Sequence, residues 1–347
     1  MKRVAFAGLL ALLLAQPSIQ SREDGGRAFL PPLAVTYRAS ESVEASEVRR
    51  RQASRRRSGE SLGLQTIQIS ARARTLRPGE LVVLSIALPA RASRVRVRAF
   101  GRDVVAYPEG EHEWRALVGI DLDVKPGTYS ATADADAAGA EGPARAGGGP
   151  MQAVYSLVVT PRTFRTRRLT VNEAFVTPPA SERDRIDREA KLLDGVWKSP
   201  EGERLWHEPF VRPVQQEANS AFGTRSIFNG KPRSAHGGAD FLSPAGTPVQ
   251  APNAGRIVVA RSLYFSGNTI VIDHGLGLFS MLAHLSEIDV HEGDRVAAGH
   301  IVGRVGATGR VTGPHLHWAV RAGGARVDPL SLLELLGAPT ANPPRHP

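Results

Sequence analysis

The chain of 347 residues contains no cysteine. Disulfide bonds and metal sites with thiolate ligands are therefore excluded. The chain also lacks an H-E-x-x-H motif, so a helix that presents two zinc ligands and a glutamate base is excluded. If the protein has a catalytic metal site, its base must come from elsewhere, and ten histidines are available.

Long apolar runs are missing as well. The apolar run at residues 4–15 is shorter than the ~20 residues that a membrane-spanning helix needs. Because Lys2 and Arg3 precede it, the pattern predicts a secretory signal peptide over residues 1–20. We therefore expect an exported protein of the periplasm, cell envelope or extracellular space, with no stable membrane span after signal cleavage. An uncleaved N-terminal anchor is the alternative.

The charge is strongly unbalanced. Lysine and arginine total 44 against 34 aspartate and glutamate residues, which gives a net charge of +10. A basic surface favours polyanions, such as nucleic acid, anionic lipid or the acidic polymers of a bacterial envelope. The sequence shows no recognisable nucleic-acid-binding module and no pattern of alternating aromatic and basic residues, so we expect no nucleic-acid partner.

The first half of the chain predicts a basic linker followed by a β domain. Residues 21–62 have few apolar side chains and two arginine triplets, at 49–51 and 55–57, which is typical of a disordered segment. Residues 63–162 contain short stretches of alternating apolar and polar residues, separated by turn signals such as Pro78-Gly79 and Pro126-Gly127. This pattern predicts an immunoglobulin-like β-sandwich.

The second half predicts a linker with a short helix and another β-rich domain. Within the linker, residues 163–208, an apolar face at helical spacing indicates a helix that packs on the neighbouring domain, and Ser181 is expected to cap it. The second β-rich domain is expected over residues 209–336, and a disordered tail over 337–347. The predicted fold class is thus mainly β. The residues of the helix face are Ile186, Ala190, Leu193 and Trp197.

Two histidines two positions apart form the first candidate site. His315 and His317 follow Pro314 in a segment that reads as a strand, where residues two apart point to the same face. Leu316 and Trp318 would then face the opposite way, into the core. The two imidazoles could share a metal ion, or one could bind the metal while the other acts as an acid or base.

A second candidate lies in the segment H-G-G-A-D. In an extended chain His236 and Asp240 would be ~13 Å apart, too far to share one ion. The two glycines between them permit a tight turn or bulge that would bring them together. A histidine, a carboxylate and a distant histidine supply a three-ligand zinc site with a fourth position open for water, as catalysis requires.

An ordered series of motifs completes the pattern. It resembles the lysostaphin/LytM-type zinc metallopeptidase domain over about 120 residues, a third of the chain, and the order of the motifs is more specific than any one of them. The motifs are F-G-T-R (222–225), R-S-A-H-G-G-A-D-F (233–241), G-T-P-V-Q-A-P (246–252), I-V-I-D-H-G (270–275), A-H-L-S (283–286), G-D-R-V-A-A-G (293–299) and G-A-T-G-R-V-T-G-P-H-L-H (306–317).

The resemblance implies a role for five residues. His236 and Asp240 match the ligand pair of the family, and His317 matches the third ligand of a single Zn2+ ion. His315 and His284 match the two catalytic histidines, which orient or deprotonate the zinc-bound water. The implied function is a zinc-dependent endopeptidase that hydrolyses peptide bonds in peptidoglycan stems or cross-links. One departure is Leu282, where many relatives carry a tyrosine.

Other interpretations remain open at this point. A non-catalytic LytM-like activator of another cell-wall hydrolase would use the same fold, but typically lacks part of the zinc site. A lipoyl-type carrier needs a lysine at its hairpin, and no lysine follows Lys231. His274 is expected to be structural or to support the site, His291 and His300 to be exposed, and Arg225 to be either structural or a contact for a substrate carboxylate.

Overall fold

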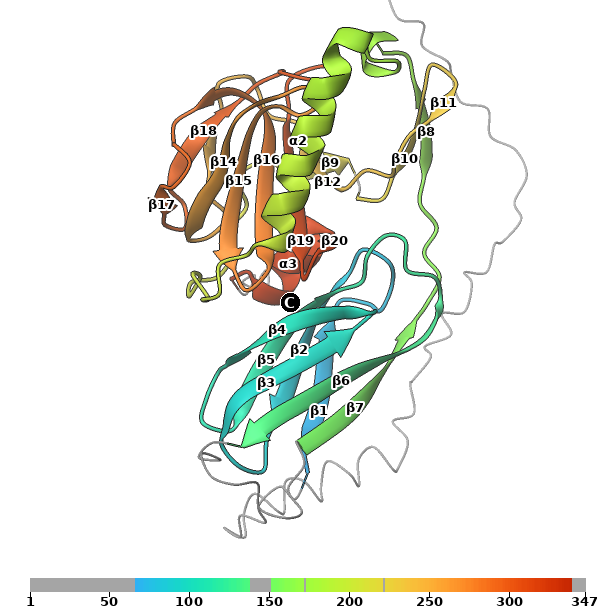
Figure 1. Ribbon diagram of the computed structural model, residues 1–347. Coiled ribbons are helices and arrows are strands. Elements are labelled where there is room, and N and C mark those ends of the chain that lie inside the picture. Colours follow the sequence, from blue (N-terminus) through green and yellow to red (C-terminus); the bar gives the residue numbers. More distant parts are fainter. Residues whose placement is uncertain (1–65, 138–150, 172, 221, 339–347) are drawn as a thin grey trace, which may run out of the picture. The chain divides into compact units, whose positions relative to one another are not determined.

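The computed structural model describes residues 66–137 and 151–338, apart from positions 172 and 221 (Figure 1). The predicted signal peptide, the basic segment 21–62 and all but the first two residues of the predicted tail lie outside the described residues. Among the helices that are described, none combines the length and apolar character needed to cross a membrane.

The N-terminal part is a seven-stranded antiparallel sheet in the order β1-β2-β5-β4-β3-β6-β7. Strand β4 pairs with β3 through Arg102–Val105 and with β5 through Ala106–Pro108, so the sheet turns over a common core. The first and last strands contact each other, which makes the sheet barrel-like. The strands are β1 (Gln68–Ala73), β2 (Leu81–Ala87), β3 (Ala92–Ala99), β4 (Arg102–Pro108), β5 (Glu113–Gly119), β6 (Gly127–Ala137) and β7 (Met151–Val159).

Strand β2 is buried on both faces. Val82 and Leu84 pack in the core of the N-terminal sheet. Leu81 and Val83 point the other way and belong to the core of the C-terminal part. A strand that is covered on both sides needs no polar alternation, which explains the continuous apolar run at its start.

Buried charges join the same two parts. The Arg74 guanidinium donates hydrogen bonds to Glu80 and Asp328, two carboxylates that are 3% and 5% exposed. Arg162 also donates to Glu80. Asp328 in addition accepts a hydrogen bond from the Leu330 amide and so caps helix α3 (Pro329–Leu336). One carboxylate therefore fixes the start of that helix and its contact with the N-terminal sheet.

The connecting segment contributes a strand and a helix. Strand β8 (Thr166–Leu169) and the 3-10 helix η1 (Glu173–Phe175) precede helix α2 (Ala180–Lys198). The prediction that Ser181 caps α2 is wrong, because the helix begins at Ala180, two residues earlier than that cap implies, and Pro179 occupies the cap position without a side-chain hydrogen bond. Proline suits the start of a helix because its missing N–H needs no partner there.

Helix α2 lies against one face of the C-terminal sheet, as predicted (Figure 1). Leu193, Val196 and Trp197 pack on a small apolar cluster of that sheet, and the Trp197 and Phe279 rings meet edge to face at 5.3 Å. Ala190, in contrast, is exposed. The apolar face of the helix is therefore confined to its C-terminal half.

The C-terminal part is a ten-stranded sheet whose main path is β17-β14-β15-β16-β19-β12-β9. The predicted mainly β fold is confirmed. A separate three-stranded sheet has the order β11-β10-β8, with β8 parallel to β10. The strands are β9 (Ala218–Ser220), β10 (Arg225–Phe228), β11 (Lys231–Pro232), β12 (Gly238–Phe241), β13 (Pro248–Gln250), β14 (Gly255–Leu263), β15 (Gly267–Gly275), β16 (Leu278–Ile288), β17 (Arg295–Val296), β18 (Ile301–Val305), β19 (Leu316–Ala322) and β20 (Ala325–Val327).

Candidate metal centre and active site

Strand β19 carries the first candidate pair, and its side chains alternate as predicted. Leu316, Trp318 and Val320 are at most 1% exposed and point into the core. His317 points to the open face, and His315 immediately precedes the strand. Strand β12 runs antiparallel beside β19 with Asp240 directly opposite His317. The register of this strand pair therefore brings the carboxylate to the imidazole.

The side chains of His236 and Asp240 meet as expected, because the His236 Nε2 atom lies 2.9 Å from Asp240 Oδ1. The glycines serve a different purpose from the predicted turn, since neither adopts a positive φ. A Cβ atom on Gly238 would lie 2.4 Å from the Trp318 carbonyl oxygen and 2.8 Å from the His317 ring. Glycine is required there so that strands β12 and β19 can approach each other at the site.

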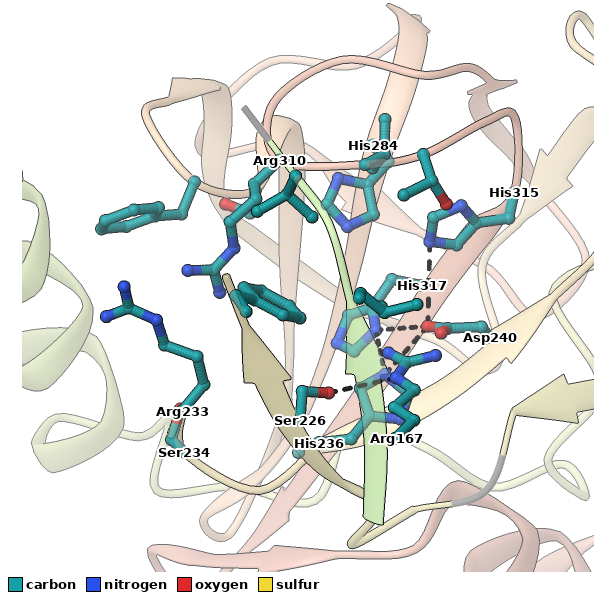
Figure 2. A pocket seen from close by; sticks show the side chains of 18 of the residues that line it. Arg167, Ser226, Arg233, Ser234, His236, Asp240, His284, Arg310, His315 and His317 are labelled. Carbon is teal, nitrogen blue, oxygen red and sulfur yellow. Dashed lines mark hydrogen bonds and ion pairs between the residues drawn. The ribbon is translucent and has the colours of Figure 1, made fainter. Parts of the chain in front are cut away.

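Three atoms converge on one point (Figure 2). Besides the His236–Asp240 contact, His317 Nδ1 lies 2.8 Å from Asp240 Oδ1 and 3.0 Å from His236 Nε2. Tetrahedral zinc with nitrogen and oxygen ligands at ~2.0–2.1 Å places neighbouring ligand atoms about 3.3 Å apart. Two histidines and one carboxylate at these separations fit a single small divalent ion.

The protonation states of Asp240 and His317 also suit metal binding. Burial would raise the pKa of Asp240, but hydrogen bonds from His236 and His317 outweigh it and hold the pKa well below its usual range. Burial lowers the pKa of His317. The carboxylate is therefore ionised and the imidazole neutral at neutral pH, which are the forms that bind metal.

His284 and His315 stand beside this triad. The His284 ring centroid lies 4.9 Å from that of His315 and 5.9 Å from that of His317. His315 Nε2 is 3.9 Å from Asp240 Oδ1. The structure thus brings together all five residues that the sequence singled out.

Backbone carbonyls fix the tautomer of both rings. The Nδ1 atom of His284 lies 2.9 Å from the Thr308 oxygen, and that of His315 lies 2.9 Å from the Gly313 oxygen. Because a carbonyl oxygen only accepts hydrogen bonds, each Nδ1 carries the proton, and each Nε2 presents a lone pair when the ring is neutral. Burial lowers the pKa of His284 to about 3, and the neighbouring histidines add to this effect. His284 is therefore a neutral imidazole with a free acceptor atom.

The backbone at His284 is itself unusual. Its φ angle is 67°, in the left-handed region that few non-glycine residues adopt. The residue lies in β16, where the register with β15 shifts between Asn268 and Ile270, and its amide donates to the Ser266 oxygen. A strained backbone that other contacts hold in place is typical of functional positions. Two residues earlier, Leu282 is fully buried, so a side chain there faces the core and not the site.

His274 belongs to a buried chain of hydrogen bonds behind β19. Its Nδ1 donates to the Ala254 oxygen at 2.8 Å, and its Nε2 accepts from the Ser280 hydroxyl at 2.9 Å. The Ser280 oxygen accepts in turn from Trp318 Nε1. His274 thus supports the strand that carries His317 without facing the site. His291 and His300 are exposed, as predicted.

The stability of the fold should depend on His274 at mildly acid pH. Complete burial lowers the pKa of His274 from its ordinary 6.5 to about 4. Between pH 6.5 and 4 the unfolded chain therefore binds a proton at His274 that the folded protein does not bind. The contribution of His274 to the free energy of unfolding is full above pH 6.5 and is lost as the pH falls towards 4. We expect a free energy of unfolding about 2 kcal/mol smaller at pH 5 than at pH 7.5 from this group.

Urea unfolding of the metal-free protein at both pH values provides the measurement, with His274→Gln as the comparison. Glutamine keeps a donor and an acceptor but does not titrate in this range. The pH-dependent loss should shrink by about 2 kcal/mol in the variant, since other histidines titrate equally in both proteins. An identical pH dependence in the two proteins would refute this account of His274.

The five residues line one cavity of about 360 Å³. Sequence reasoning missed several others on its walls, notably Arg167, Arg233 and Arg310. Arg233 and Arg310 lie inside the quoted motifs, but their spacing of 77 positions gives no local sign that they meet. Arg167 comes from strand β8, which reaches the cavity by pairing with β10. Arg225, the arginine that the sequence suggested, is exposed and does not line the cavity.

The comparisons with known proteins agree with this site. A family model described as Peptidase family M23 matches residues 234–329, which include all five residues. The crystal structure of a candidate M23 peptidase from Pseudomonas aeruginosa is 31% identical in sequence, with a TM-score of 0.58, and the match covers 75% of this chain and 96% of that one. The chain belongs to peptidase family M23. The predicted resemblance to lysostaphin/LytM-type peptidases is thereby confirmed.

Curated relatives match the M23 protein over part of their length. Peptidoglycan DD-endopeptidase ShyA of Vibrio cholerae is 37% identical over 138 residues, which are 39% of this chain and 32% of that protein. Glycyl-glycine endopeptidase ALE-1 of Staphylococcus capitis is 45% identical over 85 residues, 24% of each protein. The chain therefore spans about a third or less of the length of these relatives.

Proposed function

We propose that this M23 protein is a zinc-dependent endopeptidase that hydrolyses peptide bonds in the stems or cross-links of peptidoglycan. The observation that carries the proposal is the convergence of two histidines and one aspartate on a common point, with two further imidazoles on the wall of the same cavity. A non-catalytic activator is not favoured, because it would not need this complete set.

His236, Asp240 and His317 would hold one zinc ion per chain. Zinc bound there would supply a Lewis acid for the scissile carbonyl and for the attacking water. The three ligands leave room on the cavity side for water and substrate, which is the condition for a catalytic rather than a structural site. The low pKa of Asp240 keeps one negative charge in place to balance the ion.

His284 and His315 would move the proton. A neutral His284 with a free Nε2 can accept the proton of the attacking water as its oxygen adds to the carbonyl carbon. The C–N bond then breaks, and the protonated imidazole returns the proton to the departing amine, so that the ring ends in its starting form. His315 presents its Nε2 to the same space and can orient the water or hydrogen-bond the reacting groups.

The relatives and the net charge support the proposed substrate, and the predicted signal peptide supports the proposed location. The name of ShyA specifies peptidoglycan, and an acidic wall polymer suits a chain with a net charge of +10. The predicted signal peptide at residues 1–20 would place the protein in the periplasm, the envelope or outside the cell. We further propose that the domain at residues 63–162 positions the protein or binds the wall, and that residues 209–336 form the catalytic domain.

Digestion of purified peptidoglycan tests the proposal. Incubation with the protein should release soluble peptide fragments, and mass spectrometry should identify a new amino terminus and a new carboxyl terminus at one type of bond. A chelator should stop the release, and added zinc should restore it. The proposal is wrong if the fragment pattern with protein equals that of the buffer control.

A further inference from the structure

Two arginines on one wall of the cavity have no anionic partner. Arg310 and Arg233 point towards each other across the cavity from Asp240 (Figure 2). Neither forms an ion pair with any residue that the structure describes. The acidic side chain that lines this cavity is Asp240, and His236 and His317 already contact it. Two positive charges therefore face a cavity that does not neutralise them.

Aromatic rings hold Arg310 in place. Its guanidinium carbon lies 4.7 Å from the centre of the Phe265 ring and 5.3 Å from that of the Phe228 ring. These contacts orient the planar group by cation–π attraction but leave its five N–H donors without acceptors in the described part of the chain. A guanidinium fixed in this way loses little conformational freedom when it binds an anion.

Arg233 is anchored from the connecting segment. One of its terminal nitrogens donates to the Val176 oxygen, just after η1. Its Nε atom is buried and has no hydrogen-bond partner among the described residues. Burial and the charge of Arg233 both lower the pKa of Arg310, which reflects the repulsion between the two groups. An anion between them would relieve this repulsion and satisfy the free donors.

We infer that Arg233 and Arg310 form a subsite for a carboxylate of the peptide substrate, on the residue next to the scissile bond. The inference rests on the proposed hydrolase function and specifies its substrate class. A paired guanidinium fork matches the two oxygens of a carboxylate, and charge-assisted hydrogen bonds of this kind are among the strongest in proteins.

This subsite discriminates between kinds of cross-link. When D-alanine is joined to the side-chain amine of diaminopimelate, the carbon that carries the scissile nitrogen also carries a free carboxylate. In a glycine bridge the same position continues as a neutral peptide bond. The arginine pair therefore favours the first kind of cross-link over the second, because only the first supplies an anion beside the bond.

A matched pair of synthetic cross-linked peptides tests the subsite. Both contain the D-alanine–diaminopimelate bond, and they differ only in whether the carboxylate beside that bond is free or amidated. The zinc-loaded wild-type protein should cleave the free form with a kcat/KM about 10- to 100-fold higher, the value of a charge-assisted hydrogen-bond pair. In Arg310→Gln this preference should fall to within about twofold, with the zinc content retained.

Two further variants sharpen the result. Arg233→Gln should reduce the preference in the same direction, and Arg310→Lys should retain an intermediate preference because it keeps the charge but not the fork. Arg225→Gln is the matched control, since Arg225 is exposed and does not line the cavity. It should keep the full wild-type preference. Thermal unfolding of each variant identifies any protein that has failed to fold.

The outcomes separate the subsite from the hydrolase. Equal cleavage of both peptides by the wild type overturns the subsite and leaves the hydrolase intact. Equal losses on both peptides in Arg310→Gln and Arg233→Gln assign these residues a structural role and also overturn it. A third peptide, amidated only at the C-terminal carboxylate of the stem, should be cleaved like the free form; a loss there overturns the assignment beside the scissile bond. Failure to cleave any peptide or whole peptidoglycan refutes the proposed function itself.

Discussion

Replacing His236 or Asp240 by alanine is expected to abolish stoichiometric zinc binding. Each supplies one of three atoms that lie within 2.8–3.0 Å of one another, so either substitution leaves two ligands. Changing residues that merely support a ligand typically costs 10- to 100-fold in metal affinity, and loss of a ligand should cost more than about 100-fold. Peptidoglycan hydrolysis should disappear together with the metal.

Metal analysis of dialysed protein, followed by calorimetric titration with zinc, provides the measurement. His300→Ala is the matched control, because this histidine belongs to the same domain but is exposed and does not line the cavity. It should bind one zinc ion per chain with wild-type affinity. Retention of one zinc ion per chain by both His236→Ala and Asp240→Ala would exclude the proposed ligand set.

Replacing His284, unlike replacing a zinc ligand, should leave zinc bound while turnover is lost. Its imidazole touches no ligand atom by a hydrogen bond in the described structure; its Nδ1 donates to the Thr308 oxygen. Removing a positioned base lowers the rate about 10²- to 10⁴-fold. We expect kcat to fall by that factor while the zinc content stays at one per chain. His315→Ala should behave in the same way.

The backbone at position 284 dictates the choice of variants. At a φ of 67°, alanine is strained by roughly 1–2 kcal/mol, whereas asparagine tolerates the left-handed region better. His284→Asn therefore separates loss of the imidazole from a change in the backbone. His284→Ala and His284→Asn should be equally inactive. If His284→Asn retained near-normal turnover with bound zinc, the role of proton acceptor would have to pass to another residue.

Local pattern and motif order pointed to five residues that the structure brings into one cavity. The period of two in a strand placed His315 and His317 on one face and Leu316 and Trp318 on the other. That rule depends only on the geometry of one strand. The order of the motifs supplied His236, Asp240 and His284, which no single-strand rule could have joined. The helix α2 was expected from the helical spacing of apolar residues, which is also a local pattern, although its N-cap was predicted at the wrong residue.

Several predictions failed or were absent because they depend on partners distant in the chain. Glycines at 237 and 238 were expected to permit a tight turn or bulge, but the close approach of β12 to β19 is what requires Gly238. Arg225 was left open between a structural role and a contact with a substrate carboxylate; it is exposed and does not line the cavity. Arg310 reaches the cavity instead because Phe228 and Phe265 hold it there, and those rings come from strand β10 and from the loop before β15.

By itself the sequence determined which side chains are candidates to bind a metal and move a proton, because residue type, strand periodicity and the order of motifs can be read along the chain. Only the tertiary structure decided how they meet. The register between β12 and β19 sets Asp240 opposite His317, and the pairing of β8 with β10 brings a segment from the connecting region to the cavity. Such pairings are selected by the burial of whole sheets, so no short stretch of residues encodes them.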